Sequence, residues 1–113
     1  MNYKFIIKQH GNHYYFGLYP NNSNTQPIGI SDDFDSYEKA ARGICIFRQL
    51  IKESPEAFEQ FSNERGYLFA LKDNKYSISF KRTLPLTHKY EVPHCINRIY
   101  KHIDAPLEIY TEE

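Results

Sequence analysis

Residues 3–19 read YKFIIKQHGNHYYFGLY, and residues 67–80 read YLFALKDNKYSISF. In both stretches apolar or aromatic side chains alternate with other residues on either side of a short turn sequence, Gly11-Asn12 or Asp73-Asn74. Alternation with a period of two indicates strands with one buried face, and the turn residues between them indicate hairpins. The same pattern therefore starts twice along this chain.

The first hairpin is followed by a third strand and a helix. Residues 27–31 predict the short strand. Asp35 is the expected N-cap of the helix, because Glu38 lies three residues further on, as in a capping box. The helix is expected to end before Pro55, which cannot continue it.

The second half repeats this order with a shorter connection. Residues 93–103 predict a helix, with a proline tolerated in its first turn, and residues 88–92 are the expected third strand. Each helix is followed by a segment that begins with proline and contains residues 57–61 or 107–109. Taken alone, residues 57–61 are compatible with a short helix, but residues 107–109 alternate as a strand. Since internal repeats outrank local propensity as evidence, both segments are predicted as strands.

Length and composition favour one globular domain. The chain has 113 residues, of which 41% are hydrophobic and 25% charged, as is usual for a folded domain of common size. The unit strand-strand-strand-helix-strand is used twice, so we predict one α+β domain over residues 1–113. The first tandem β-β-β-α-β repeat is placed at residues 1–62 and the second at residues 65–111.

Four residues in the first repeat have clear structural roles. Ser31 and Ser36 suit turn and cap hydrogen bonds. Gly43 allows close approach of the helix to the sheet, and Phe34 is expected to anchor the connection beneath the helix.

Four segments of the first repeat match the pattern of a known family: Tyr14-Tyr15-Phe16-Gly17-Leu18, Ile28-Gly29-Ile30-Ser31, Phe34-Asp35-Ser36 and Gly43-Ile44. Through these residues the first repeat resembles the YegP-like family, a group of small uncharacterised bacterial proteins. The resemblance implies that the two repeats share one mostly antiparallel sheet, with two helices packed on one face and the last strands exchanged between repeats. It implies no activity, so no catalytic residue is carried over.

No arrangement of residues predicts an enzyme. Cys45 has no matching histidine and lies on a largely apolar helix, so we expect a buried structural thiol. The carboxylates of Asp32, Asp33 and Asp35 precede a helix N-terminus, where capping and the helix dipole explain them. We therefore expect no catalytic residue.

Metal and cofactor sites are not expected either. His94 and Cys95 are neighbours on a helix, so their side chains diverge by about 100° and cannot share a metal ion. His94 and His102 lie about 12 Å apart along the helix axis, which is too far for two ligands of one ion. The sequence also contains no phosphate loop and no dinucleotide-binding fingerprint.

The expected location is the cytoplasm. No signal-peptide pattern and no apolar run long enough to span a membrane occurs in the sequence, and two cysteines are too few for a disulfide framework. We expect reduced thiols and no membrane partner.

The first hairpin predicts a contact surface. If the alternate residues face the helices, then His13, Tyr15 and Tyr19 point outward, joined by Ile6 from the neighbouring strand. Tyrosine-rich patches are common anchors of protein contacts. We therefore expect either a protein partner or self-association through these four residues, as in an accessory or inhibitory subunit. The alternative is that both tyrosines simply lie flat on a solvated sheet.

The second half carries a local excess of positive charge. Seven basic and two acidic residues lie between Lys72 and Lys101, although the formal net charge of the whole chain is zero. The alternative function is therefore single-stranded RNA or DNA binding, with the two tyrosines stacking on bases. The residues expected to meet phosphates are Lys81, Arg82, Arg98 and Lys101.

Overall fold

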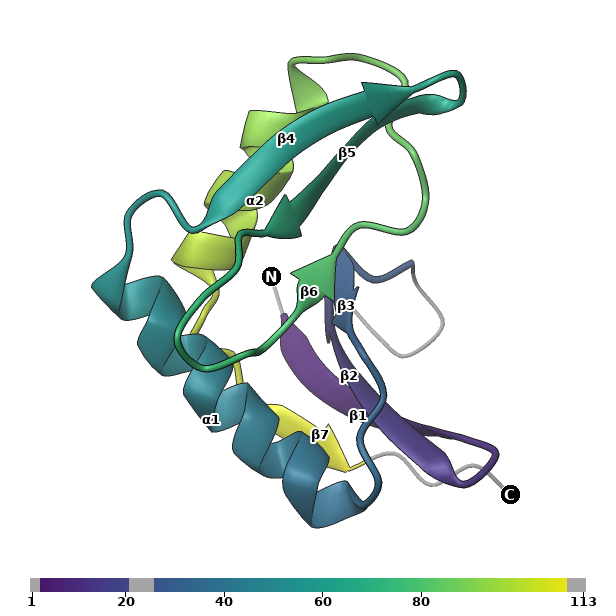
Figure 1. The fold of residues 1–113 in the computed structure, drawn as a ribbon, viewed down its shortest axis with the longest axis vertical. Coiled ribbons are helices and arrows are strands. Elements are labelled where there is room, and N and C mark those ends of the chain that lie inside the picture. The colour runs from purple at the N-terminus through teal and green to yellow at the C-terminus, as the bar shows by residue number, and fades with distance from the viewer. Residues whose placement is uncertain (1–2, 21–25, 110–113) are drawn as a thin grey trace.

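A computed structural model describes residues 3–20 and 26–109 (Figure 1). It contains one seven-stranded sheet in the order β4-β5-β6-β3-β2-β1-β7 and two helices, so the protein has an α+β fold. The elements are β1 (Lys4–His10), β2 (His13–Tyr19), β3 (Gly29–Ser31), α1 (Tyr37–Glu53), β4 (Phe58–Asn63), β5 (Gly66–Leu71), β6 (Phe80–Lys81), α2 (Glu91–Lys101) and β7 (Leu107–Ile109).

The first hairpin forms as its alternation predicts. β1 and β2 pair antiparallel, and Phe5 lies opposite Leu18 while Ile7 lies opposite Phe16. These four side chains are buried beneath the helices, where the Phe5 and Phe47 rings meet edge to face at 6.2 Å. Both helices contribute to the same core as this face of the sheet.

The N-cap of α1 is Ser36, and the prediction of Asp35 is wrong. The Ser36 hydroxyl accepts a hydrogen bond from the Lys39 amide at 3.1 Å, and Ser36 has the extended backbone typical of a cap. Asp35 precedes the cap and lies 3.7 Å from the Lys39 ammonium instead. The helix ends at Glu53, before Pro55, as predicted.

Gly43 and Ser31 have the structural roles expected of them. A Cβ atom on Gly43 would lie 2.7 Å from Phe34 Cζ and 3.3 Å from Phe16 Cε2, so only glycine lets α1 approach these rings. The buried Ser31 hydroxyl accepts from the Phe16 amide and donates to the Asp32 carbonyl, both at 2.9 Å. The hydrogen bond from the Phe16 amide connects the end of β3 to the middle of β2.

The second hairpin is shorter than its alternation predicts. Only Phe80 and Lys81 form β6, whereas the strand was expected to start near Tyr76. Ser77 has a φ of 54°, in the left-handed region. The Asn74 side chain accepts hydrogen bonds from the Tyr76 and Ile78 amides and so holds a turn where the strand was expected.

The third strand predicted at residues 88–92 is also wrong. The chain instead touches the start of β5 earlier, through an isolated antiparallel bridge between Tyr67 and Leu86. Glu91 starts α2, and its carboxylate accepts from the His88 amide at 2.8 Å. This local hydrogen bond favours a helix start over a strand.

Residues 58–63 and 107–109 are strands, as predicted from the proline-led segments. β4 pairs with β5, and β7 pairs with β1, so each final strand lies beside the first strand of the other half. The two pairings differ in direction, because β4 is antiparallel to β5 whereas β7 is parallel to β1. β4 and β7 are the edges of the sheet.

Candidate functional site

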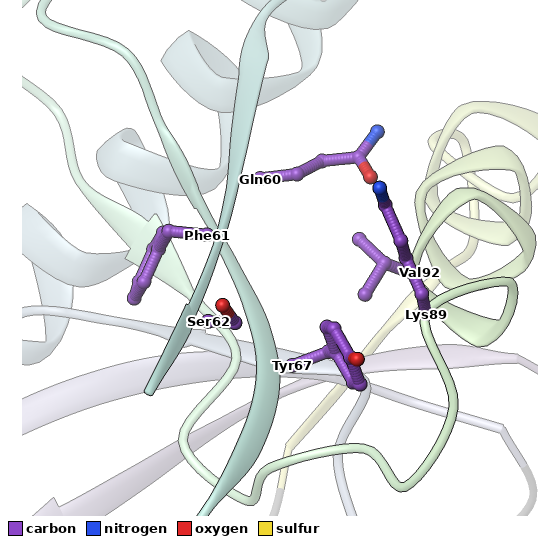
Figure 2. A pocket seen from close by; sticks show the side chains of 6 residues that line it. All are labelled: Gln60, Phe61, Ser62, Tyr67, Lys89 and Val92. Atoms are coloured by element: carbon purple, nitrogen blue, oxygen red, sulfur yellow. The ribbon is translucent and has the colours of Figure 1, made fainter. Parts of the chain in front are cut away.

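A groove runs between the edge strand β4 and helix α2. Its larger part is a cavity of about 410 Å³ between the end of β4 and the start of α2. A second cavity of about 170 Å³ continues toward the start of β4, and Gln60 lines both. Figure 2 shows the Gln60 side chain extending toward Lys89 while Phe61 points away from the cavity. The larger part is lined by Gln60, Phe61, Ser62, Tyr67, Lys89 and Val92, and the smaller part by Pro55, Glu56, Ala57, Phe58, Gln60, Ile96 and Tyr100.

The open side of β4 borders this groove. The Lys72 amide donates to the Ala57 carbonyl at 2.9 Å, and Phe58 lies opposite Leu71. In an antiparallel ladder this register points the backbone N–H and C=O groups of Gln60 and Ser62 away from β5. Within residues 3–20 and 26–109, no strand pairs with that side of β4.

One end of the groove is held in place by Tyr100. Its hydroxyl donates to the Ser54 carbonyl at 2.6 Å and accepts from the Ala57 amide at 3.0 Å. The Phe58 ring packs edge to face on Phe69 at 5.5 Å and on Tyr100 at 6.2 Å. The start of β4 is therefore fixed against both α2 and the core.

The other end of the groove is positively charged. Lys89 is exposed, and the structure shows no ion pair to its ammonium among the residues it describes. The first turn of α2 begins next to it at Glu91, whose carboxylate offsets the partial positive charge of the helix N-terminus, so Lys89 is the cation at this end of the groove. The repeat predicted a strand at residues 57–61, most of which lie in β4, but nothing in the sequence placed Lys89 beside it.

The four residues of the predicted contact surface lie on one face of the sheet, opposite the helices. Tyr15 pairs with Lys8, and Ile6 pairs with Gly17. The exposure expected for two of these residues is wrong, because Ile6 is fully buried and Tyr19 is 2% exposed. His13 is exposed and Tyr15 is half-buried.

The Tyr19 ring lies over Gly17, which is two residues earlier on the same face of β2. A Cβ on Gly17 would lie 2.9 Å from Tyr19 Cε1, and the Lys8 ammonium lies 4.8 Å from the centroid of the Tyr19 ring. Burial raises the pKa of the Tyr19 phenol, and its hydrogen bond with Tyr15 and the nearby Tyr15 charge raise that pKa further. On the outward side of this hairpin, Gly17, Lys8 and Tyr15 therefore all lie against Tyr19.

The same face of the sheet exposes an apolar side chain on β4 instead. Phe61 is 46% exposed and lies opposite Leu68 on β5. Leu84, in the connection that follows β6, is 48% exposed. The exposure of Phe61 could have been predicted, because Phe61 lies three residues after Phe58 in an expected strand and therefore on the opposite face of the sheet.

The four predicted phosphate-binding residues do not form one surface. Lys81 is exposed on the sheet face opposite the core residue Phe80. Arg82 donates to backbone carbonyls, among them that of Leu84 at 2.7 Å. Arg98 on α2 donates to the Tyr3 hydroxyl at 2.6 Å, and Lys101 is exposed on the same helix.

The other groups considered as candidates are the two cysteines, the acidic residues and the potential metal ligands. Cys45 is exposed, so the expectation of a buried thiol there is wrong; Cys95 is the buried one. Hydrogen bonds from Gln49 and then Tyr76 lower the pKa of the exposed Glu53 carboxyl. In the described part of the chain, no group of three potential metal ligands comes together, and neither helix is long and apolar enough to cross a membrane.

Comparison with known proteins bears on the fold. No family model matches the chain, and no curated protein matches it in sequence. It is similar to the solution NMR structure of YegP from E. coli, a protein of unknown function, with a TM-score of 0.72 at 19% sequence identity. The similarity covers 99% of this chain and 97% of YegP. The chain therefore has the YegP fold. This similarity confirms the resemblance to the YegP-like family that its residues predicted.

Proposed function

We propose that this protein is a non-enzymatic interaction module that binds another protein through the open side of β4. One observation carries the proposal: the backbone groups of Gln60 and Ser62 point away from β5, and no described residue pairs with them. A sheet edge of this kind is a ready template for another polypeptide.

The composition of β4 supports a contact role for this edge. Proteins commonly protect edge strands with charges, prolines or bulges. β4 contains one charged residue, Glu59, and no proline, and it pairs with β5 without a bulge over all six residues. Phe61 adds an exposed aromatic ring on the same strand.

We also propose that the two halves of the chain are diverged copies of one unit, as the tandem repeat in the sequence predicts. Aligning the helices at Ile44 and Ile96 makes Arg48 of α1 equivalent to Tyr100 of α2. Arg48 donates to the Ile103 and Ala105 carbonyls beyond α2, while Tyr100 donates to the Ser54 carbonyl beyond α1. This reciprocity supports an origin by duplication, after which the halves diverged in their surface residues.

Affinity capture with the full-length protein from its source cells tests the proposal. We expect a protein partner that is retained after nuclease treatment and that is reduced severalfold by Phe61→Ser, with unchanged circular dichroism. Phe61 is exposed, so its loss changes the surface more than the core.

A matched variant on the other half of this face is Tyr15→Ser. A partner lost on Tyr15→Ser and kept on Phe61→Ser would move the contact to the first hairpin. Recovery of nucleic acid alone, with binding that weakens steeply as salt rises, would replace the proposal with the single-stranded nucleic-acid alternative.

A further inference from the structure

The geometry points to one kind of occupant for the groove between β4 and α2: an extended segment of a partner polypeptide. We infer that this segment adds to β4 as a further strand, with apolar side chains against α2 and an acidic group at Lys89. The inference rests on the proposed function and specifies its ligand.

The backbone of β4 supplies the first part of the recognition. Gln60 and Ser62 are two residues apart, so their outward N–H and C=O groups repeat at about 7 Å, the period of a strand. A peptide laid along this side completes the hydrogen bonds that β5 cannot reach. These bonds are independent of the peptide's sequence and therefore account for affinity rather than selectivity.

The facing helix supplies a place for side chains. Val92, Ile96 and Tyr100 are spaced by four residues, so they form one stripe along α2, and all three line the groove. An added strand points every second side chain toward that stripe. Apolar residues at alternate positions of the peptide fit the partly buried Ile96 and the buried Val92.

Charge at the two ends sets an order along the ligand. Lys89 lines the end near the start of α2, and the exposed Glu56 lines the end near Tyr100. A carboxylate of the peptide, from a side chain or from its C-terminus, is complementary to Lys89. A basic residue is complementary to Glu56.

A second copy of this chain fits the groove less well. Pairing β4 with its own copy about a two-fold axis keeps the groove-facing side of both strands on one face. Each copy would then bring the polar side chains of Gln60 and Ser62 toward the other copy's apolar stripe. A strand with apolar residues at those positions matches it better.

The test uses a displayed library of random seven-residue peptides, selected on the immobilised full-length protein. Selected peptides are synthesised with a fluorophore and titrated with the protein by anisotropy. The informative variant is Ser62→Pro, which removes one outward N–H at a position where an edge strand tolerates proline. Ser62→Ala is its control, since it keeps the N–H, and Lys89→Glu tests the charge.

We expect selected peptides to alternate apolar residues and to contain an acidic residue near one end. Affinity should fall about tenfold on Ser62→Pro and stay within about twofold on Ser62→Ala. Only the first variant loses a backbone hydrogen bond, which is one between uncharged groups. Lys89→Glu should weaken binding by about fivefold, less at high salt. Hydrogen exchange on the wild-type protein should show protection of the Gln60 and Ser62 amides on binding. This readout decides the question even if Ser62→Pro does not fold.

Each contrary result is distinct. If peptides bind Ser62→Pro and wild type equally and do not protect these amides, the groove is not the peptide-binding site. The proposed function as an interaction module is then unaffected. A dimer of the free protein that Ser62→Pro dissolves makes the occupant a second copy. Protection of the same amides by oligouridine RNA makes it a nucleic acid. If no peptide is selected and no protein is captured from cells, the proposed function itself falls.

Discussion

His102 lies where a ring stack and a charge cluster meet. Its imidazole stacks on the Tyr3 ring at 3.7 Å with an angle of 6° between the planes. Burial, followed by the nearby Lys101 and Arg98 charges, lowers the pKa of His102 below its ordinary value of 6.5. The folded protein therefore holds this side chain neutral at a pH where the unfolded chain protonates it.

This difference predicts a loss of stability in mild acid. A lowered pKa in the folded state means that the stabilisation is present above pH 6.5 and is lost as the pH falls through the folded value. Between about pH 7.5 and about pH 5.5, the wild type should lose more free energy of unfolding in urea than His102→Phe, which keeps a stacked ring without a titrating group. Equal losses in the two proteins would contradict the role of His102.

Several single residues could be predicted because their role depends on near neighbours in sequence or on an absent side chain. Ser36, which accepts from the Lys39 amide three residues on, and Gly43 are of this kind. The burial of Tyr19 could not be predicted from alternation, because its ring turns onto Gly17 rather than standing out from the sheet. The exposure of Cys45 was not predicted. The apolar pattern of a helix shows which residues share a face, but it does not show whether another element packs on that face.

At the scale of the element, the start of α1 depends on one hydroxyl. Ser36 accepts from the Lys39 amide, whereas the neighbouring Asp35 carboxylate is 79% exposed and forms ion pairs with the His13 and Lys39 side chains, at 3.9 Å and 3.7 Å. Exposed ion pairs of this length contribute little.

Substitution distinguishes the two residues. Ser36→Ala should lower the free energy of unfolding by about 1 kcal/mol, the usual effect of losing an N-cap, and should weaken helical circular dichroism at raised temperature. Asp35→Ala should change it by less than about 0.5 kcal/mol. Urea denaturation measures both values. A larger loss in the free energy of unfolding for Asp35→Ala than for Ser36→Ala would show that Asp35 is the N-cap, as the sequence predicted.

Most elements could be predicted from periodicity, and the failures share a cause. β1, β2, β5 and both helices follow their apolar patterns, and β4 followed from its likeness to the segment after α2. The segment that ends at β6 failed because the Asn74 side chain competes for backbone amides. Such competition depends on local geometry that alternation does not report. The groove also depends on how α2 lies beside β4, which is a tertiary arrangement.

At the scale of the whole molecule, each half is fastened to the other through the connection that follows a helix. Arg48 reaches the connection after α2, and Tyr100 reaches the connection after α1. Arg48 also lies over the Phe5 ring at 5.1 Å, so it joins α1, the core and the approach to β7.

Removing these contacts should weaken the molecule as one unit. Arg48→Met and Tyr100→Phe keep most of the packing and lose the polar contacts, so each should lower the free energy of unfolding by about 1–3 kcal/mol. The double variant should lose about the sum, since the two contacts serve separate connections. Tyr90→Phe, at a side chain 64% exposed, is the control and should change little. Urea denaturation followed by fluorescence and circular dichroism measures both the losses and whether the two probes still coincide; unchanged stability in both single variants would contradict the fastening.

The parallel pairing of β7 with β1 also concerns synthesis of the chain. The ribosome delivers Phe5 about a hundred residues before its partner Leu107. Until then the nascent protein presents an unpaired side of β1 in addition to that of β4. Two open strand edges on an incomplete chain favour aggregation. We therefore expect the period just before residues 107–109 emerge to be when this protein most needs chaperones.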